Sequence, residues 1–253
     1  LPYRPKRRTK GVIAKEKGLE PLAQLIWKQR GIDPGKEATP FLDPEKQVET
    51  LEDALAGARD IMAEIVNESD EARSKVRNLF FSRAVVKSRV VAGMQEKGAK
   101  FKDYFECDEP IDKVPSHRML AMRRGEKENI LILDIVPEEA DGIAILEGLF
   151  VKGEGADSDQ VKMAILDGYK RLRSRSMETE TRLALKDRAD REAIVFFTGN
   201  LRELLMASPL GAKRILAIDP GYRTGGKLVC LDRQGKLLHH ATVYIIGSGK
   251  QAR

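Results

Sequence analysis

Cysteine and aromatic residues are scarce in this sequence of 253 residues, and long apolar runs are missing from it. Its two cysteines, Cys107 and Cys230, stand far apart in unlike contexts, so they predict neither a disulfide framework nor a zinc site. No apolar run approaches the ~18 residues of a membrane span, and no segment resembles the apolar core of a signal peptide. These absences favour a protein of the reducing cytoplasm that has no membrane partner.

The sequence also lacks an initiator methionine, because it begins Leu1-Pro2-Tyr3. It stops at Arg253, soon after three apolar segments of strand character. Three strands with an apolar face need a helix or further strands to cover them, and none follows here. We therefore expect a fragment of a longer protein with both ends cut.

Positive charge is concentrated at the beginning of the chain. Residues 1–31 contain nine Lys and Arg against two Glu, a net charge of +7, whereas the whole chain carries +6. The densest part lies within residues 4–10 and supplies the candidate phosphate-binding residues Arg4, Lys6, Arg7, Arg8 and Lys10. Such a cluster suggests an anionic partner such as RNA or DNA, although a solvated basic surface has the same composition. Aromatic residues do not alternate with these cations beyond Tyr3, so phosphate contact is favoured over base stacking.

Apolar residues recur at helical spacing over most of the chain before Pro209, which predicts a mainly α-helical region. A capping box, Thr50-Leu-Glu-Asp53, opens a helix that ends near Asn67. Further helices are predicted at 11–30, 69–82, 117–124 with Ser116 as its cap, 158–173 and 177–207. The last is the longest, and its expected buried stripe consists of Leu185, Ala189, Ala193, Phe196 or Phe197, Leu201, Leu204 and Leu205.

The middle of the chain gives less regular patterns. Residues 84–106 are expected to be helical at first and then broken by Gly93 and Gly98. Phe101, Tyr104 and Phe105 form an aromatic cluster that we assign to the core. Strands are predicted at 130–136 and at 142–151, and 31–44 and 153–157 are predicted loops.

The end of the chain places a carboxylate beside glycines. A buried-looking strand, 215–218, leads to Asp219 and a Pro-Gly turn, and strands at 227–231 and 241–246 follow. Asp219 is either a turn residue or a ligand for a metal or phosphate at a strand end. One carboxylate cannot hold two metal ions, and Asp232 is predicted to lie in a hairpin turn.

Two glycine patterns resemble phosphate-binding loops. Residues 221–227 nearly spell a P-loop, but Leu228 stands where the Ser or Thr should be and strand character replaces the helix. Residues 247–252 match a dinucleotide-binding pattern whose helix lies beyond the chain. The histidines give no metal site either, because His239 and His240 are adjacent and His117 has no partner in sequence. We predict no metal, no cofactor and no small-molecule substrate.

Several segments together resemble a known family, the Tex transcription accessory proteins of bacteria. The residues that carry the resemblance are residues 1–11, Gly18-Leu-Glu-Pro-Leu-Ala23, Ala54-Leu-Ala-Gly-Ala-Arg-Asp-Ile61, Gly98-Ala-Lys-Phe-Lys-Asp-Tyr-Phe105, Pro115-Ser-His-Arg-Met-Leu-Ala121, residues 124–126 and 190–194, and residues 200–211 leading into Ile218-Asp-Pro-Gly-Tyr-Arg-Thr-Gly225. The resemblance spans nearly the whole chain. Residues 245–249 depart from it, since the family commonly has Tyr-Pro-His there.

The resemblance implies a mainly α fold with two parts. Residues 1–209 would be a central helical scaffold, and residues 210–253 the first three strands of a truncated YqgF-type, ribonuclease-H-like α/β domain. It implies a non-enzymatic accessory factor that binds nucleic acid, RNA or DNA, with the transcription machinery as a further candidate partner. Related proteins also carry helix-hairpin-helix elements and an OB-fold domain that this sequence does not contain.

Two other functions stay open. In resolvases of the ribonuclease-H-like fold the first-strand Asp is a metal ligand, and Asp219 matches it, so a metal-dependent nuclease is the main alternative. A nucleotide-binding ATPase of actin-like fold also begins with a strand, an Asp-Gly turn and a second strand. Metal-dependent cleavage would favour the nuclease, and saturable ATP binding would favour the ATPase.

Overall fold

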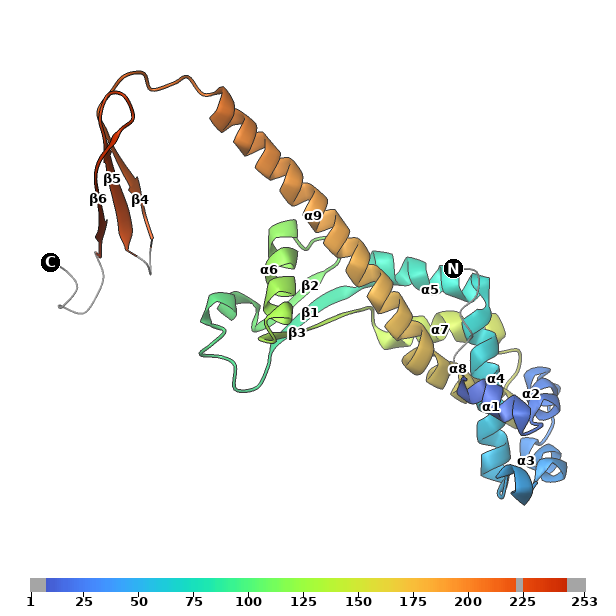
Figure 1. Cartoon of the computed structure of the whole chain (residues 1–253). Coiled ribbons are helices and arrows are strands. Elements are labelled where there is room, and N and C mark those ends of the chain that lie inside the picture. The colour runs from blue at the N-terminus through green and yellow to red at the C-terminus, as the bar shows by residue number, and fades with distance from the viewer. Residues whose placement is uncertain (1–7, 222–224, 245–253) are drawn as a thin grey trace. The chain divides into compact units, whose positions relative to one another are not determined.

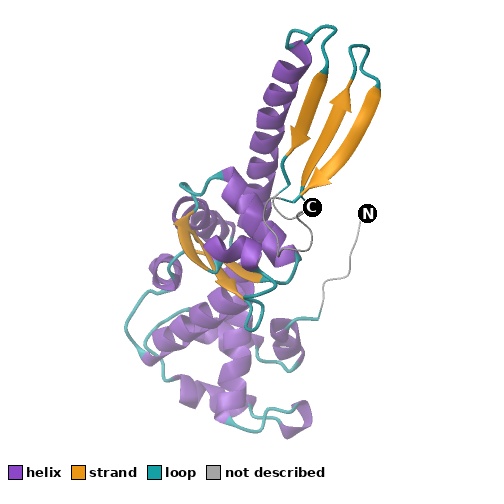
Figure 2. Ribbon diagram, turned by 90° about the vertical axis from the view of Figure 1, so that its left-hand side faces the viewer, coloured by secondary structure: helices purple, strands orange, loops and turns teal. Residues whose placement is uncertain are grey.

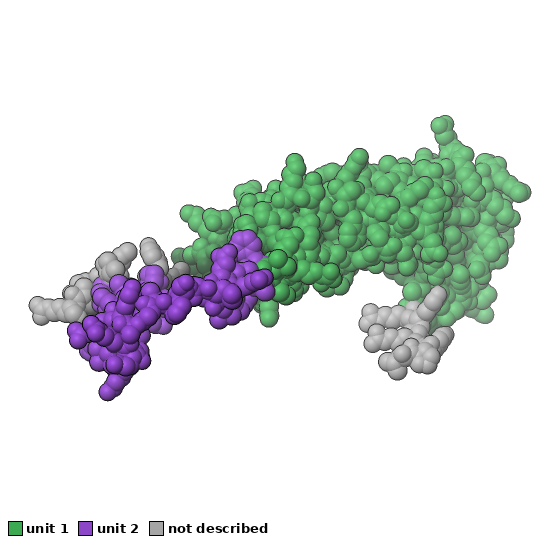
Figure 3. All heavy atoms as spheres, turned by 90° about the horizontal axis from the view of Figure 1, so that it is seen from above, with its two compact units in different colours: residues 1–195 green, residues 196–253 purple. Residues whose placement is uncertain are grey.

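The computed structural model describes residues 8–221 and 225–244, and it divides into two compact units, 1–195 and 196–253 (Figure 3). The helices and helical turns are α1 (Lys10–Glu16), α2 (Glu20–Trp27), α3 (Pro34–Ala38), η1 (Thr39–Phe41), η2 (Pro44–Lys46), α4 (Leu51–Glu68), α5 (Asp70–Arg83), η3 (Ala99–Tyr104), α6 (Ser116–Lys127), α7 (Glu139–Phe150), α8 (Ala156–Gly168), η4 (Tyr169–Arg173) and α9 (Ser174–Met206). The strands are β1 (Val85–Val90), β2 (Glu106–Pro110), β3 (Leu131–Val136), β4 (Ile215–Asp219), β5 (Gly226–Leu231) and β6 (Leu237–Val243). A mostly helical region followed by a three-stranded antiparallel sheet confirms the predicted fold class. The domain boundary after Pro209 stays a prediction.

Helix α4 is the centre of the first hydrophobic core, and α1, α2 and α8 pack around it (Figure 1). The predicted capping box is confirmed at its start: Thr50 Oγ1 accepts from Asp53 N at 3.1 Å, and the Asp53 carboxylate accepts from Thr50 N at 2.9 Å. Gly57 lets α4 lie close to its neighbours, since a Cβ there would be 2.3 Å from Cδ1 of the buried Leu19.

The single helix predicted for 11–30 is wrong, because the chain breaks between α1 and α2. Gly18 takes φ +87°, a left-handed conformation that only glycine adopts easily. The loop predicted for 31–44 likewise contains the short helix α3, whose N-terminal N–H groups on Gly35 and Lys36 bond to Asp33.

Two polar side chains tie the start of the chain to the region around α8. The Gln29 amide donates to Phe150 O at 2.7 Å and accepts from Lys152 N at 2.8 Å. The buried Asp157 carboxylate accepts from Gly31 N at 2.8 Å and Ile32 N at 3.2 Å. These contacts satisfy backbone groups in loops that have no ladder partner.

A second core lies under a small antiparallel sheet of order β2-β1-β3 (Figure 2). The helix predicted at the start of 84–106 is wrong, because β1 occupies it with alternately buried Val86 and Ser88. Helix α6 packs on this face, with Met119 and Met122 buried. The aromatic cluster is confirmed as core, with Phe101 buried and Tyr104 and Phe105 packed against it. Ser116 is the first residue of α6, and Pro115 takes the cap position predicted for it.

Helix α9 closes the outer edge of β3. The Glu178 carboxylate accepts from Ile135 N at 3.2 Å, and Arg182 Nη2 donates to Leu133 O at 2.5 Å. Arg182 also bonds to Glu178 at 2.7 Å and to Glu126 of α6. An open strand edge presents unpaired N–H and C=O groups to which another chain can pair. The Glu178 and Arg182 side chains occupy two of these groups on β3.

The strand predicted for 142–151 is also wrong, because residues 142–150 belong to α7. Its expected first residue, Gly142, is instead a packing position within the helix. A Cβ at this position would lie 2.4 Å from atoms of the Tyr169 ring, so α7 approaches η4 closely only because glycine is there. Ile143 and Leu146 then face the first core at helical spacing.

Arg173 is a buried cation whose hydrogen-bond partners are backbone carbonyl groups. It lies at the end of the π-helical segment η4, is 2% exposed, and donates to Val66 O at 3.0 Å and Asn67 O at 2.5 Å. These carbonyls are at the C-terminal end of α4, where the helix dipole favours a positive charge. Burial lowers the pKa of the Arg173 guanidinium to about 10, and the nearby Arg73 and Arg77 act in the same direction.

The buried stripe predicted along α9 is only half correct. Leu185 and Ala189 are buried, but Ala193 and the apolar positions beyond it are exposed: Phe196 75%, Phe197 67%, Leu201 41%, Leu204 74% and Leu205 75%. The helix itself is confirmed as the longest of those described. The spacing of apolar residues therefore predicted the helix and its apolar face. It did not predict that other parts of the chain bury this face only as far as Ala189.

In the second unit, β4, β5 and β6 form an antiparallel sheet in chain order. The strand expected to be buried, β4, is exposed instead, with Leu216 62% and Ile218 61% accessible. The third strand begins at Leu237, earlier than predicted, and residues 245–246 lie outside the described residues. The hairpin role of Asp232 is confirmed, since its carboxylate accepts from Gln234 N and Lys236 N.

Candidate nucleic-acid interface

The predicted phosphate-binding residues lie just before and at the start of α1. Arg4, Lys6 and Arg7 lie outside the described residues, whereas Arg8 and Lys10 are described. Thr9 caps the helix, because its hydroxyl accepts from Val12 N at 3.2 Å. The structure thus places the last two predicted residues at an exposed helix start.

Arg8 already has an anionic partner. Its Nη2 atom lies 2.5 Å from Oε2 of Glu16, at the other end of α1, and both side chains are largely exposed. Ion pairs of this kind contribute about 0–1 kcal/mol, because water solvates both charges well. The Arg8 guanidinium is therefore held only weakly by this pair.

Helix α1 is fixed on α4 by its first residues. Gly11 N donates to Glu64 Oε1 at 3.0 Å, and Gly11 and Ala14 are buried against α4. A carboxylate at this position also complements the positive end of the helix dipole.

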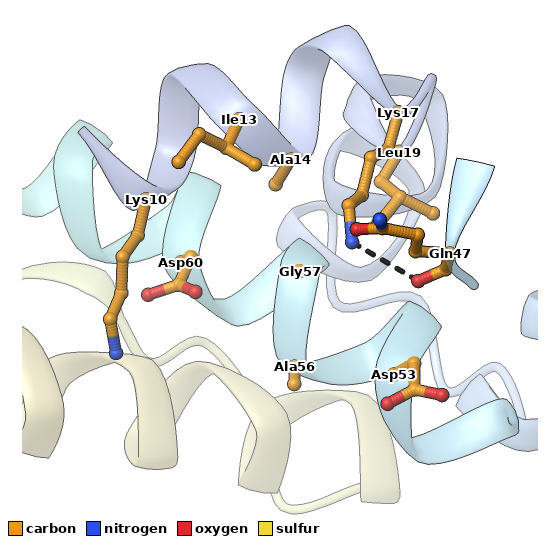
Figure 4. Close-up of a pocket in the computed structure, with 10 residues that line it drawn as sticks. All are labelled: Lys10, Ile13, Ala14, Lys17, Leu19, Gln47, Asp53, Ala56, Gly57 and Asp60. Atoms are coloured by element: carbon orange, nitrogen blue, oxygen red, sulfur yellow. Dashed lines mark hydrogen bonds between the residues drawn. The ribbon is translucent and has the colours of Figure 1, made fainter. Parts of the chain in front are cut away.

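A groove of about 310 Å³ runs between α1 and α4 (Figure 4). Its charged ends are Lys10 with Asp60, and Lys17 with Asp53. Lys17 Nζ donates to Gln47 O at 3.1 Å. Two lysines and two aspartates balance, so the groove does not attract a polyanion.

Burial and neighbouring charges act in opposite directions on the pKa of Asp60, which lines this groove. Burial raises the pKa of its carboxyl, while Arg171 and Lys10 act in the opposite direction. Arg171 Nη2 lies 2.9 Å from Asp60 Oδ1 and also contacts Asp167 at 2.7 Å. Lys10 therefore faces an aspartate that already has a stronger cationic partner.

Asp219 ends β4, and its cross-strand neighbour is Lys227. Among residues 8–221 and 225–244, no three His, Cys, Asp or Glu side chains gather where they could hold a metal ion. His239 and His240 follow each other on β6 with ring centroids 6.4 Å apart. Lys227 lies in β5 and not at a helix start, which is where a P-loop lysine stands, and the strand character predicted for 227–231 is confirmed. The second glycine pattern, 247–252, falls outside the described residues.

The sequence alone does not identify the carboxylates that lie near the basic residues of α1, namely Glu16, Asp60 and Glu64. In the sequence, Glu16 enters only as one charge within a basic segment. Its separation of eight residues from Arg8 was a usable signal, because it spans about two helical turns. Asp60 and Glu64 are four residues apart on α4 and share a face, but nothing in the sequence brings that face to α1.

Comparison with known proteins agrees with this two-part architecture. Residues 29–197 match the model described as Tex central region-like, and residues 213–253 match that of the Tex protein YqgF-like domain. The chain therefore belongs to the Tex family of transcriptional accessory proteins.

Relatives include Protein YhgF of Escherichia coli (strain K12), which is 40% identical over 255 residues that make up 96% of this chain and 33% of the relative. Transcriptional accessory protein Tex of Neisseria gonorrhoeae is 36% identical, over 97% of this chain and 33% of its own length. S1 RNA-binding domain-containing protein 1 of Homo sapiens is 27% identical, over 94% and 25%. The chain thus spans about a third of the length of its bacterial relatives. None of the described helices is both long and apolar enough to cross a membrane.

Proposed function

We propose that this chain is part of a non-enzymatic transcription accessory factor that binds the phosphate backbone of RNA or DNA. Arg4, Lys6, Arg7, Arg8 and Lys10 are the proposed contacts. The observation that carries the proposal is the net charge of +7 in residues 1–31 of a Tex-family chain. Cations that neutralise phosphates release bound counterions, which gives affinity without sequence preference.

The described contacts support this role for Arg8. Its side chain is 69% exposed, and its one ion-pair partner among the described residues, Glu16, is itself 51% exposed. A guanidinium offers two parallel donors that a phosphate can accept. Its exposed pair with Glu16 is weak enough to be exchanged for a phosphate. Lys10 contributes charge at the same helix start.

Fluorescence anisotropy with labelled single-stranded RNA and duplex DNA, measured across a salt series, tests the proposal. Changing Arg7 and Arg8 to Ala should weaken binding equally for all sequences and lower the salt slope by about 0.7–0.9 for each phosphate that is no longer neutralised. Changing Lys162 and Lys186 to Ala removes the same charge from exposed pairs elsewhere and is the control. An unchanged slope in the Arg7 and Arg8 variant removes these residues from the site.

A metal-dependent nuclease is the alternative function. The observation that favours it is Asp219 at the end of β4, in the segment that matches the YqgF-like model. Several carboxylates must converge for two-metal chemistry, and Asp219 alone is insufficient. Cleavage of RNA or DNA by the full-length protein with Mg²⁺ or Mn²⁺, abolished by Asp219→Asn, would establish the nuclease and refute the non-enzymatic proposal.

A further inference from the structure

We propose that Glu16 is a built-in competitor of nucleic-acid phosphate, because it occupies the Arg8 guanidinium in the unbound chain. The inference rests on the proposed function and assigns a regulatory carboxylate to that same surface. Binding at Arg8 would then be an exchange of one anion for another. The affinity of the surface is set by Glu16 as well as by its cations.

The geometry of α1 carries this inference. Arg8 stands before the helix and Glu16 is its last residue, yet the side chains meet at 2.5 Å. The guanidinium is thus drawn back along the helix towards its C-terminal end. A phosphate that approaches the basic segment finds Arg8 engaged.

The other anions near α1 have different roles. Glu64 accepts the Gly11 N–H and fixes the helix on α4. Asp60 is held by Arg171. Glu16 neither fixes a helix nor pairs with a cation outside the basic segment. Its side chain is half exposed, and its partner among the described residues is Arg8 alone. Its contact with the cluster is therefore free to open when phosphate binds.

Glu20 provides a matched control. Its side chain is 48% exposed, close to the 51% of Glu16. Glu20 lies in α2 and pairs with Lys15 of α1 at 3.4 Å. Glu16→Gln and Glu20→Gln change the net charge equally. Only the first frees a member of the proposed cluster.

The experiment measures the Kd of labelled oligouridine for the whole chain at low salt, with circular dichroism to show that each variant is folded. Glu16→Gln should tighten binding by about two- to five-fold, the range expected for opening one exposed ion pair. Glu20→Gln should give a clearly smaller gain. Equal gains for the two variants would show a general charge effect and overturn the inference.

A double-mutant cycle isolates the pair. Arg8→Ala should weaken binding, and in that background Glu16→Gln should tighten it no more than Glu20→Gln does, because there is no guanidinium to release. A larger gain for Glu16→Gln that persists without Arg8 contradicts the inference.

The two proposals fail in distinguishable ways. If the unaltered chain binds with a salt slope that falls on changing Arg4 and Arg7, but Glu16→Gln equals Glu20→Gln, only the role of Glu16 is rejected. If neither the unaltered chain nor Glu16→Gln binds oligouridine or duplex DNA, the proposed function is rejected together with the inference.

Discussion

The ring of Tyr169 occupies the space beside Gly142 that the Cβ of any other residue would take. A Cβ there would lie 2.4 Å from two ring atoms and from the hydroxyl oxygen of Tyr169, and Tyr169 is 2% exposed, so the ring has little room to move. This contact joins α7 to the π-helical segment η4.

Gly142→Ala should therefore destabilise the chain by about 1–3 kcal/mol, the usual cost of overpacking a core. Gly148 is on the same helix with no atom near its missing Cβ, so Gly148→Ala should stabilise by about 0.5–1 kcal/mol. Urea unfolding followed by circular dichroism measures both. Changes of the same sign would show that α7 does not pack on Tyr169 in this way.

Arg182→Ala should cost about 1–3 kcal/mol, because it removes the Arg182 donor to Leu133 O and one of the donors to each of the Glu178 and Glu126 carboxylates at a part-buried site. Lys186→Ala is the control on the same helix. Its pair with Asp190 is exposed, so its removal should change the free energy of unfolding by no more than about 0.5 kcal/mol. Equal effects in thermal unfolding would contradict the sealing of β3 by α9.

The two halves of α9 should respond differently to the same substitution. Leu185 is 4% exposed and Leu204 is 74% exposed. Leu185→Ala should cost about 2–5 kcal/mol through reduced burial and the cavity left behind. Leu204→Ala should stay within about 0.5 kcal/mol, as surface changes do. A large destabilisation in Leu204→Ala, measured by chemical denaturation of this chain, would mean that the second half of the helix is covered in solution.

The capping box of α4 makes stability depend on pH. Hydrogen bonds from the Thr50 hydroxyl and N–H lower the pKa of the Asp53 carboxyl below its usual 3.8. The unfolded chain therefore binds a proton first as pH falls, and the contribution of Asp53 is present above about pH 4 and lost below it. The difference in free energy of unfolding between the unaltered chain and Asp53→Asn should be constant from neutral pH to about 4 and then shrink. A difference that stays constant down to about pH 2.5 would falsify this role for Asp53.

Local signals predicted much of the fold correctly. The capping box at Thr50 placed the start of α4, and turn chemistry placed Asp232, because both depend on hydrogen bonds within a few residues. The failures come from long-range contacts. Gly142 is predicted to begin a strand, because the sequence does not show that Tyr169 lies against it, and Leu204 has the spacing of a core residue although no described residue buries it. In the candidate site, charge density identified Arg8, but only the folded helix brings Glu16 to it.

The contacts of Gln29 and Asp157 have a consequence for the order of folding. Gln29 bonds to Phe150 across 121 residues of sequence, and Gly31 bonds to Asp157 across 126. Closing loops of this length is slow compared with forming a helix. During synthesis, the first helices cannot complete their packing until residues beyond 157 have left the ribosome. The basic segment thus emerges well before the contacts of Gln29 and Asp157 can close.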